Sequence, residues 1–563
     1  MKNMKLFTLT HSKKHRGTLA ARRAAALFLC LSMLLIGAAC NTDEAPVEST
    51  NTPTLPEATI ETTPQPALGG QIVMPITRNP FLTDEGTGAN PLRINTEEMR
   101  TFYQLVYEPL LRQDINSRLA PALAERWSVD DTGRTWTIEL RENVVWHQDA
   151  HLFTADDVTY TIDQLRALGA EGYYHALVEK IESYEKIDDH TLHITMRNVG
   201  ACALYALTFP IVCSKDQSAR LNGTGPYMLE SSTSAEINLI INPRWWQQPP
   251  YIEKIRCLSR ESNEVALASY EAGQLNFVPT NNVAAGKYRE EGITRVQDVM
   301  TQNVEVILIN HARGELSDVS VRQAIAYAID RAQIVSNVYM NRLAVSDVPV
   351  APDSFLYDSG SKIYDYDLTR AAGLLAAAGW TEKNEDGYLI KGGRVFTLSL
   401  LVNESTESTY RKSTASILVT QLQKVGIMVE VESARLTLSG EKSDFEQKLE
   451  AGDFDLAMAG YNIERSGDLT AYLSSGGVRN YGRYQPSETI SQLLRSTNAA
   501  FEEKDMRETH AALQQAFVAE LPFIVIGFRM SSIVHSANIQ NMVDVRGSEI
   551  FRTIRHWYIN TAT

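Results

Sequence analysis

Two histidines four positions apart, His147 and His151, are the residues that most readily suggest chemistry, because Asp149 lies between them. Two imidazoles and a carboxylate at this spacing could hold a divalent metal ion, although histidines in a turn are more often ordinary surface groups. The sequence contains no HExxH, GxSxG, Walker or Rossmann pattern that would place a nucleophile, a catalytic metal or a nucleotide. We therefore expect neither an enzyme nor a bound cofactor.

Cys40 is the next reactive residue, and it follows a sequence typical of an export signal. A basic run that includes Lys13 and Arg22 precedes an apolar run over 24–39, whose last residues before the cysteine are small. This arrangement resembles the lipobox of bacterial lipoproteins, in which the thiol carries a lipid and becomes the mature N-terminus. We expect residues 1–39 to be a signal peptide and Cys40 to be lipidated. The alternatives are an ordinary signal peptide with a chance cysteine, or a membrane anchor, for which roughly 16 apolar residues are too few.

The segment after Cys40 has the composition of a tether. Residues 41–67 are rich in threonine, glutamate, serine and proline and contain few large apolar side chains. Such a segment buries too little apolar surface to offset the entropy lost on ordering. We expect residues 40–67 to connect the folded part flexibly to a lipid anchor in the membrane.

Three cysteines remain beyond the tether: Cys202, Cys213 and Cys257. Outside the cell, Cys202 and Cys213 could close a short disulfide loop, because disulfides persist in oxidising compartments. Buried free thiols are the alternative, since an odd number of cysteines remains and spacing does not fix the pairing.

Composition bounds the class of protein. The chain has 563 residues, of which 44% are hydrophobic and 21% are charged, as in ordinary soluble domains. About 500 residues follow the tether, too many for a single hydrophobic core, so two or three domains are expected. The formal net charge of −15 argues against a nucleic-acid partner, whose phosphates require clustered lysine and arginine.

The folded region alternates between strand and helix patterns, which indicates an α/β protein. Strands are expected at 71–76, 136–140, 190–196, 303–310, 427–431 and 523–528. A capping box predicts a helix from Thr154 through 168, and Ser317 or Asp318 could cap a helix that reaches 335. Further helices are expected from Asp367 to Gly379, over 410–425 and over 499–521.

Five blocks of sequence resemble the solute-binding proteins of bacterial ABC importers, in the extracellular family 5 that takes up oligopeptides, dipeptides and nickel. The blocks follow one another in the family's order and span most of residues 70–530. The first runs from LVYEPLL at 105–111 to TADDV at 154–158, and the others are GTGPY at 223–227, NPRWW at 242–246, VRQAIAYAIDR at 321–331 and GDFDL at 452–456. We interpret their residues as structural: Gly223 and Gly225 suit a tight turn with special backbone angles, Trp245 and Trp246 a packing turn, and Arg322 and Asp330 ion pairs or helix caps.

The resemblance implies a periplasmic-binding-protein-like fold of type II, cluster C, in which two lobes close on a ligand. Mapped onto this chain, lobe I comprises 68–100, 222–309 and 530–563, an inserted subdomain comprises 101–221, and lobe II comprises 310–529. The crossing segments 307–310 and 528–530 would form the hinge between the lobes.

The resemblance also suggests where a ligand binds. Peptide-binding members line the cleft with a segment similar to Gly-Trp-x-x-Asp, whose aspartate pairs with the peptide ammonium group. Residues 460–464, Gly-Tyr-Asn-Ile-Glu, and the following segment 468–473 align with it, with one extra residue between the two halves. Glu464 is therefore the first candidate for the ammonium partner, because a carboxylate and an ammonium group form a strong charge-assisted hydrogen bond.

Three neighbours of Glu464 complete the candidate site: Tyr461 as a stacking or packing residue, Asn462 within the same segment, and Asp468 as the alternative anion. The competing interpretation is that Glu464 and Arg465 form a solvated ion pair in a surface loop. The sequence does not choose between the two.

The resemblance implies a monomeric, lipid-anchored receptor outside the cytoplasm that captures short peptides and passes them to an ABC permease with its ATPase. A binder of a nickel chelate or another small solute is the alternative within the family. A peptide-sensing lipoprotein that is not coupled to transport is the alternative from another class.

Overall fold

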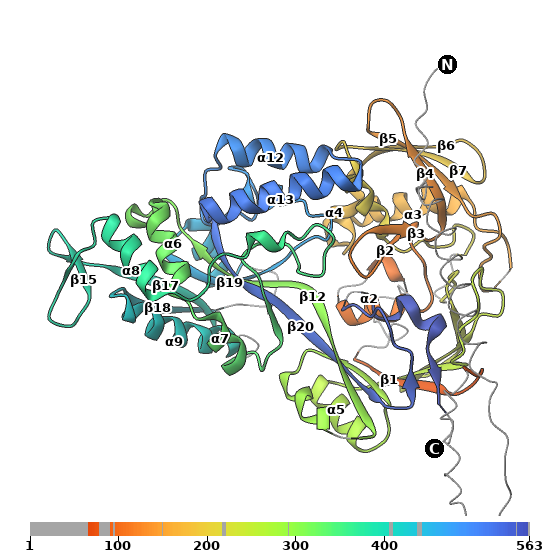
Figure 1. Ribbon diagram of the computed structural model, residues 1–563. Coiled ribbons are helices and arrows are strands. Elements are labelled where there is room, and N and C mark those ends of the chain that lie inside the picture. Colours follow the sequence, from red (N-terminus) through yellow and green to blue (C-terminus); the bar gives the residue numbers. More distant parts are fainter. Residues whose placement is uncertain are drawn as a thin grey trace, which may run out of the picture. The chain divides into compact units, whose positions relative to one another are not determined.

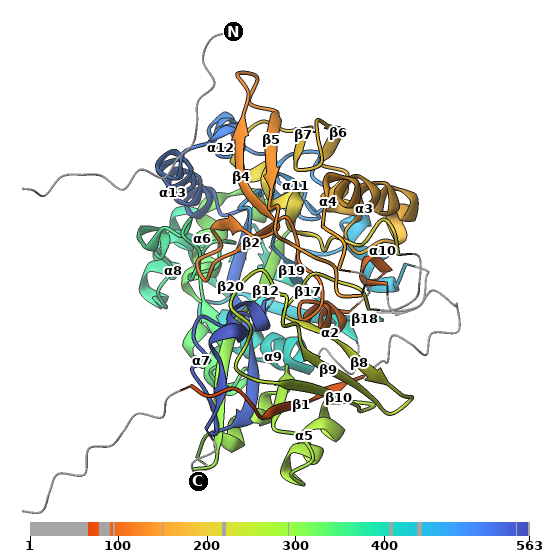
Figure 2. The same ribbon diagram turned by 90° about the vertical axis from the view of Figure 1, so that its right-hand side faces the viewer.

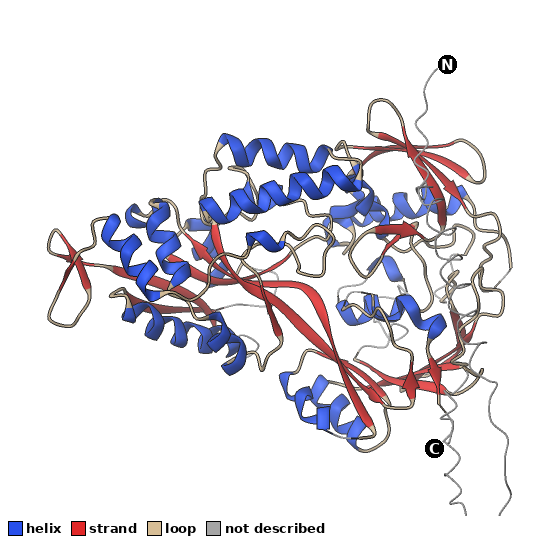
Figure 3. Cartoon of the chain, in the orientation of Figure 1, coloured by secondary structure: helices blue, strands red, loops and turns tan. Residues whose placement is uncertain are grey.

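The computed structural model describes residues 66–77, 90–93, 96–148, 150–216, 221–290, 292–404, 409–435, 442–547 and 549–560. They belong to one compact unit, which spans 66–563. The expected signal peptide, Cys40 and the tether as far as residue 65 lie outside the described residues, as does Asp149. Figures 1 and 2 show the arrangement in two views, and Figure 3 distinguishes helices from strands.

The largest described sheet contains two long strands, β12 (Thr294–Ile309) and β20 (Phe523–Ser536). They pair antiparallel and run side by side in Figure 1. Their expected buried parts, 303–310 and 523–528, are confirmed, and each strand extends well beyond them. β12 also pairs with β19 (Leu456–Asn462), and the other strands of the sheet are β11 (Phe277–Thr280), β13 (Leu343–Val345), β17 (Thr397–Glu404) and β18 (Met428–Arg435).

The register between β12 and β20 is interrupted where the expected lobes meet. Met300 pairs with Met530 and Val304 with Phe528, so residues 301–303 of β12 lie opposite Arg529 alone. An irregularity of this kind bends a strand and weakens the ladder locally. It coincides with the expected hinge segment 528–530, whereas residues 307–309 lie in regularly paired strand and Asn310 follows the end of β12.

A series of helices lies between β12 and β20 along the chain. They are α6 (Val319–Tyr327), α7 (Arg331–Asn337), α8 (Leu368–Ala377), α9 (Thr409–Lys424), α10 (Asp444–Ala451), α11 (Thr470–Leu473), α12 (Glu488–Ala499) and α13 (Glu503–Glu520). Asp367 caps α8 and Gly379 follows it with a positive φ, as expected. A small ladder of β14 (Glu382–Lys383), β15 (Leu389–Lys391) and β16 (Arg394–Val395) follows α8.

Two helix predictions are wrong in extent. The helix expected to continue to 335 is divided, because Asp330 caps a new helix, α7, after α6 has ended. The helix expected over 499–521 begins later, at Glu503, since Ala499 ends α12 and Ala500 is extended. Asp330 thus serves as a cap, and Arg322 donates hydrogen bonds to the Leu316, Ser317, Glu520 and Leu521 carbonyls, which confirms their structural roles.

The described part of the N-terminal half contains two four-stranded sheets. One has the order β1 (Gln71–Ile76), β10 (Lys254–Ser259), β9 (Glu236–Ile241) and β8 (Tyr227–Ser232), the last three being side by side in Figure 2. The other has the order β4 (Ala124–Val129), β5 (Thr135–Leu140), β7 (Thr191–Met196) and β6 (Ile181–Lys186). Its neighbour α3 (Ala155–Leu168) begins with the expected capping box of Thr154 and Asp157.

Further short elements come from the N-terminal half and from the C-terminal end of the chain. They are α2 (Glu97–Tyr103), α4 (His175–Val178), α5 (Asn263–Glu271), β2 (Leu111–Gln113), β3 (Leu119–Pro121), β21 (Ile539–Gln540), β22 (Tyr558–Ile559) and the 3-10 helices η4 (Ala201–Thr208) and η9 (Ile550–His556).

Gly223 and Gly225 are required for close approach rather than for special backbone angles. A Cβ on Gly223 would lie 1.9 Å from the Val106 carbonyl oxygen, and one on Gly225 would lie 2.8 Å from it. Neither glycine has a positive φ, so the expectation about backbone angles is wrong. These glycines let the start of β8 pass directly against the segment after α2, where Gly225 N donates to Val106 O at 2.9 Å.

The buried side chains of the described residues form two large clusters. One contains residues from Val304 to Phe528, together with Cys202. The other contains residues from Ile72 to Val299 and from Ile533 to Trp557, including Cys213 and Cys257. The cluster that runs to Phe528 includes Val304 to Ile309, which were expected in lobe I, and the boundaries of the lobes and of the inserted subdomain stay a prediction. The three cysteines are free and buried, so the free-thiol alternative holds.

Candidate ligand-binding site

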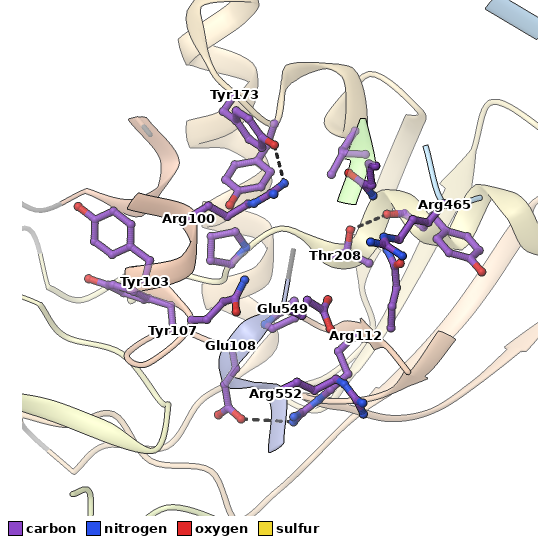
Figure 4. A pocket seen from close by; sticks show the side chains of 18 of the residues that line it. Arg100, Tyr103, Tyr107, Glu108, Arg112, Tyr173, Thr208, Arg465, Glu549 and Arg552 are labelled. Carbon is purple, nitrogen blue, oxygen red and sulfur yellow. Dashed lines mark hydrogen bonds and ion pairs between the residues drawn. The ribbon is translucent and has the colours of Figure 1, made fainter. Parts of the chain in front are cut away.

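A cavity of about 540 Å³ lies between the N-terminal half and the loop that follows β19. Figure 4 shows side chains that line it, contributed by α2, the segment before β2, η4 and η9. The end of β19 contributes Asn462, and the loop after it contributes Glu464, Arg465 and Ser466, so segments distant in sequence enclose one space. Its volume falls within the range of about 300 to 1,000 Å³ that is usual for small-molecule sites.

Aromatic side chains form much of the wall. Tyr103 and Tyr107 come from α2 and the turn after it, and their rings meet edge to face at 5.8 Å. Tyr173, Tyr174, Tyr205, Trp245 and Phe551 line other parts of the cavity. Such side chains offer apolar contact area and few rotatable bonds, which suits a site that must accept ligand side chains without a large entropy cost.

A buried carboxylate, Glu108, lies at one side of the cavity within the apolar run 105–111. It accepts hydrogen bonds from Thr224 Oγ1 at 3.0 Å, Trp245 Nε1 at 3.2 Å and Trp246 Nε1 at 3.0 Å, and Arg112 lies 3.6 Å away. Burial raises the pKa of Glu108, against the influence of Arg112 and these donors. The expected packing turn of Trp245 and Trp246 is thus confirmed, and it holds a carboxylate that we did not anticipate.

Glu464 lines the cavity and is paired with another residue of the chain. Its Oε2 lies 2.5 Å from Nζ of Lys180, which precedes β6 in the expected inserted subdomain. The Glu464 side chain is 42% exposed, so it is accessible to a ligand. Asn462, the last residue of β19, also lines the cavity.

Tyr461 and Asp468, the other two expected site residues, are not among the residues that line the cavity. Tyr461 points into the core, because the side chains of a strand alternate between its two faces. Its hydroxyl donates a hydrogen bond to Arg479 O at 2.8 Å, and its ring packs on Tyr472. It is therefore a packing residue, one of the two roles expected of it. Asp468 accepts hydrogen bonds from Thr470 N and Asn498 Nδ2, which fixes the loop before α11.

Arg465 is the most unusual side chain in the cavity. It is 8% exposed, so it does not form a solvated surface pair with Glu464. Its Nη1 lies 3.4 Å from Ser117 Oγ, and its Nε and Nη2 have no hydrogen-bond partner among the described residues. Burial, followed by repulsion from Arg546, lowers the pKa of Arg465 to about 10.

The histidine pair does not form a metal site in the part of the chain that the structure describes. His147 is 3% exposed; its Nε2 lies 3.0 Å from Gly225 O, and its Nδ1 accepts a hydrogen bond from Gly223 N. Burial lowers the pKa of His147 to about 4. His151 instead contacts Cys213, with Nε2 3.2 Å from Sγ. The described residues contain no group of three or more histidine, cysteine, aspartate or glutamate side chains arranged to hold a metal.

Comparison with known proteins decides the family. The model of the bacterial extracellular solute-binding proteins, family 5 (middle region), matches residues 118–481, more than half of the chain. The chain belongs to this family. The expected resemblance is thus confirmed, and family 5 proteins are extracellular or periplasmic solute binders of transport systems rather than enzymes. Among the described residues, no helix has the length and apolar character needed to span a membrane.

Individual relatives are distant and differ in ligand. The oligopeptide-binding protein AppA of Bacillus subtilis is 23% identical, with 84% of this chain and 89% of that protein covered. Heme-binding protein A of Haemophilus influenzae is 24% identical, with 74% and 78% covered. The crystal structure of HbpA2 from Haemophilus parasuis superposes with a TM-score of 0.76 at 20% identity, covering 87% of this chain and all of that one. This likeness confirms the two-lobe, periplasmic-binding-protein-like fold of the solute-binding protein.

Proposed function

We propose that this solute-binding protein is the lipid-anchored receptor of an ABC importer, which captures short peptides in the cavity beside Glu464 and delivers them to a membrane permease. The partner ATPase would supply the energy, so the receptor itself performs no chemical step. The proposal rests on the enclosed cavity, to which the N-terminal half and the loop after β19 both contribute. A ligand bound there would touch both lobes and favour their closed arrangement.

The size of the cavity limits the length of the peptide. A compact space of about 540 Å³ has a diameter of about 10 Å. An extended chain advances about 3.3 to 3.6 Å per residue, so about three residues span that distance. We therefore favour peptides of two to four residues over long ones, with the aromatic wall contacting their side chains.

Glu464 is the proposed partner of the peptide ammonium group. In the ligand-free protein the Lys180 ammonium group forms an ion pair with Glu464, with Nζ 2.5 Å from Oε2. A peptide N-terminus would replace one ammonium group by another, so the carboxylate stays paired throughout. Asn462 is the proposed polar neighbour of this contact, because it lies two residues away and lines the same cavity. Tyr461 and Asp468 would support the loop from behind.

The N-terminal segment would determine where capture takes place. We propose that the signal over 1–39 directs export, that Cys40 carries the lipid and that residues 40–67 separate the receptor from the membrane. The receptor would act as a monomer at the outer face of the membrane or in the periplasm. Loss of membrane association in the variant Cys40→Ser, followed by fractionation, would support this part; an unchanged distribution would contradict it.

The test of peptide capture uses calorimetric titration with tripeptides such as trialanine. The wild-type protein is expected to bind the tripeptide with a free N-terminus and to be stabilised by it, whereas nickel chloride is not expected to stabilise the protein. The variant Glu464→Gln should weaken this binding by more than about tenfold, because the charge partner of the peptide ammonium group is lost. N-acetylated trialanine should bind wild type and variant equally weakly. Equal binding of trialanine by both proteins would place the ammonium site elsewhere.

A further inference from the structure

The expected inserted subdomain and the expected lobe II are joined by direct contacts that do not involve the strands β12 and β20. Ala201 N, at the start of η4, donates a hydrogen bond to Ala500 O at 2.9 Å, in the connection between α12 and α13. Phe501 of the same connection packs on Trp136 of β5, with ring centroids 6.1 Å apart. Backbone and side chains therefore both take part in this contact.

Hydrogen bonds around the turn between β2 and β3 extend the contact. Phe355 N donates to Asn116 O at 2.9 Å, and Asn116 Nδ2 donates to Asp353 O at 3.1 Å. Arg118 forms two hydrogen bonds with the Glu503 carboxylate of α13, at 2.9 and 3.1 Å. We call the segments joined in this way the bridge, namely 116–118, 136 and 201 on one side and 353–355, 465 and 500–503 on the other. Separation of the two lobes requires the bridge to open.

Arg465 is a buried charge within the bridge that lacks a full set of partners. Its side chain is 8% exposed, and its Nε and Nη2 have no hydrogen-bond partner among the described residues. Its Nη1 lies 3.4 Å from Ser117 Oγ, which also accepts a 2.8 Å hydrogen bond from Nη1 of Arg546. Arg546 is buried too and belongs to the expected lobe I. Two guanidinium groups, one from each lobe, thus converge on one hydroxyl group.

The neighbouring carboxylates do not offset the cost of this arrangement. Asp353 is paired with Arg546, whose Nη2 lies 2.6 Å from Oδ2, and Glu464 is paired with Lys180. Asp353 and Glu549 favour the charged form of Arg465, but burial and repulsion from Arg546 outweigh them and lower its pKa. A buried charge in this state disfavours the arrangement that buries it.

Opening of the bridge would relieve that cost. Separation of the lobes moves Arg465 away from Arg546 and brings its unpaired N–H groups into water, which supplies the missing hydrogen bonds. The interrupted register between β12 and β20 gives the two strands a place to bend. The bridge therefore combines contacts that hold it closed with one charge that favours its opening.

We propose that Arg465 destabilises the closed bridge, so that the lobes separate readily and a ligand enters and leaves the cavity quickly. The statement about ligand exchange rests on the proposed function, whereas opening of the bridge requires no ligand. Arg465 acts through its own burial and needs no contact with the ligand. A neutral side chain of similar length at this position should make opening rarer.

Hydrogen–deuterium exchange of the ligand-free protein, followed by mass spectrometry, measures opening of the bridge. The reporters are peptides that contain Ala201 and Phe355, whose amides donate across the bridge. In wild type they should exchange faster than the paired amides of β9 and β10, because the bridge opens without unfolding of the core. In Arg465→Met they should exchange at least about fivefold more slowly than in wild type. The control Arg495→Met, which removes a 66% exposed side chain of α12, should match wild type.

The kinetics of tripeptide binding give an independent test. Mixing with trialanine in a stopped-flow instrument can be followed by tryptophan fluorescence, because Trp245 lines the cavity. In Arg465→Met, association and dissociation should both be at least about fivefold slower than in wild type, whereas Kd should change by less than about twofold. A lower affinity with faster dissociation would overturn the inference, since it would show that Arg465 contacts the ligand.

Unchanged or faster exchange of the bridge amides in Arg465→Met would also overturn the inference and leave the proposed function standing. Arg465→Gln, which is neutral but polar, repeats the measurement with a second side chain and should also slow these amides. If trialanine does not bind wild type, peptide capture fails instead, and exchange of the bridge amides alone decides the inference. Circular dichroism verifies that each variant is folded.

Discussion

Replacement of Arg465 by methionine should stabilise the ligand-free protein. Methionine is similar in length, is apolar and adapts to irregular spaces, so it removes the charge with little change in packing. The perturbed group is well buried, and its Nε and Nη2 have no described partner that would be left unsatisfied by the change. Most substitutions of buried residues destabilise a protein, so a gain would be a specific signature of an unpaired charge.

The size of the gain follows from the electrostatics of the site. Burial, and then Arg546, lowers the pKa of Arg465 to about 10. Compared with the ordinary arginine value, this corresponds to about 3 kcal/mol of unfavourable free energy for the charged form, at about 1.4 kcal/mol per pH unit. The folded and unfolded chains are both protonated at pH 7, so the whole penalty is present there and is relieved only as the pH rises above about 10. Loss of the Nη1 contact with Ser117 Oγ reduces the expected gain to about 1 to 3 kcal/mol.

Calorimetry or denaturant unfolding of the ligand-free protein at pH 7 measures this gain. Roughly 500 folded residues, at about 2 cal/mol/K each, give an unfolding entropy of about 1 kcal/mol/K, so the midpoint should rise by about 1 to 3 °C. The control Arg495→Met removes an exposed arginine and should shift the midpoint by less than about 1 °C. A loss of stability in Arg465→Met beyond that of the control would refute the reasoning, since it would mean that Arg465 is well paired in the folded chain.

Three further predictions concern the scaffold around the site. Gly223→Ala should lower the free energy of unfolding by at least about 2 kcal/mol, because its Cβ would lie 1.9 Å from the Val106 carbonyl oxygen. The control Gly314→Ala should have little effect, because its Cβ meets no atom within 4 Å. Equal denaturation midpoints of the two variants would contradict this prediction. Because burial lowers the pKa of His147 to about 4, the unfolded chain takes up a proton near pH 6.5 that the folded chain does not, and stability should fall between pH 6.5 and 4. Thermal unfolding of His147→Gln should show a smaller fall over that interval, and parallel curves would refute the assignment. Alkylation followed by peptide mapping should find the buried cysteines reduced and unreactive until the protein is denatured, and a disulfide-linked peptide would contradict this; they are Cys202, Cys213 and Cys257.

Much of the fold could be predicted because local signals and tertiary structure agree. The capping box at Thr154 begins α3 as expected, and the apolar runs that mark β12 and β20 are buried. The errors arise where tertiary contacts override local preference. Residues 499–502 have a helix-compatible sequence, but Phe501 packs against Trp136 of β5, with ring centroids 6.1 Å apart, and the chain is extended at Ala500.

The candidate site could be predicted only in part. Alignment with the family motif identified the end of β19 with Asn462 and the following loop with Glu464, and both residues line the cavity. It did not reveal that Lys180 pairs with Glu464, since 284 positions separate them in the sequence. Glu108 carried a signal that could have been used, because a glutamate within the apolar run 105–111 indicates a buried carboxylate.

Arg465 could not be recognised from the sequence because adjacent residues of opposite charge are usually a solvated pair. Its significance comes from burial and from the two nitrogens without described partners, which are properties of the folded chain. The structure separates the neighbours: Glu464 faces Lys180, and Arg465 faces Ser117. The loop between β19 and α11 thus presents both charges to the same cavity.

A crystal structure of the protein with bound trialanine tests the central claim most directly. The account predicts that the peptide lies in the cavity after β19, with its ammonium group on Glu464 in place of Lys180. A peptide bound outside this cavity, or inside it with its ammonium group away from Glu464, would contradict the account.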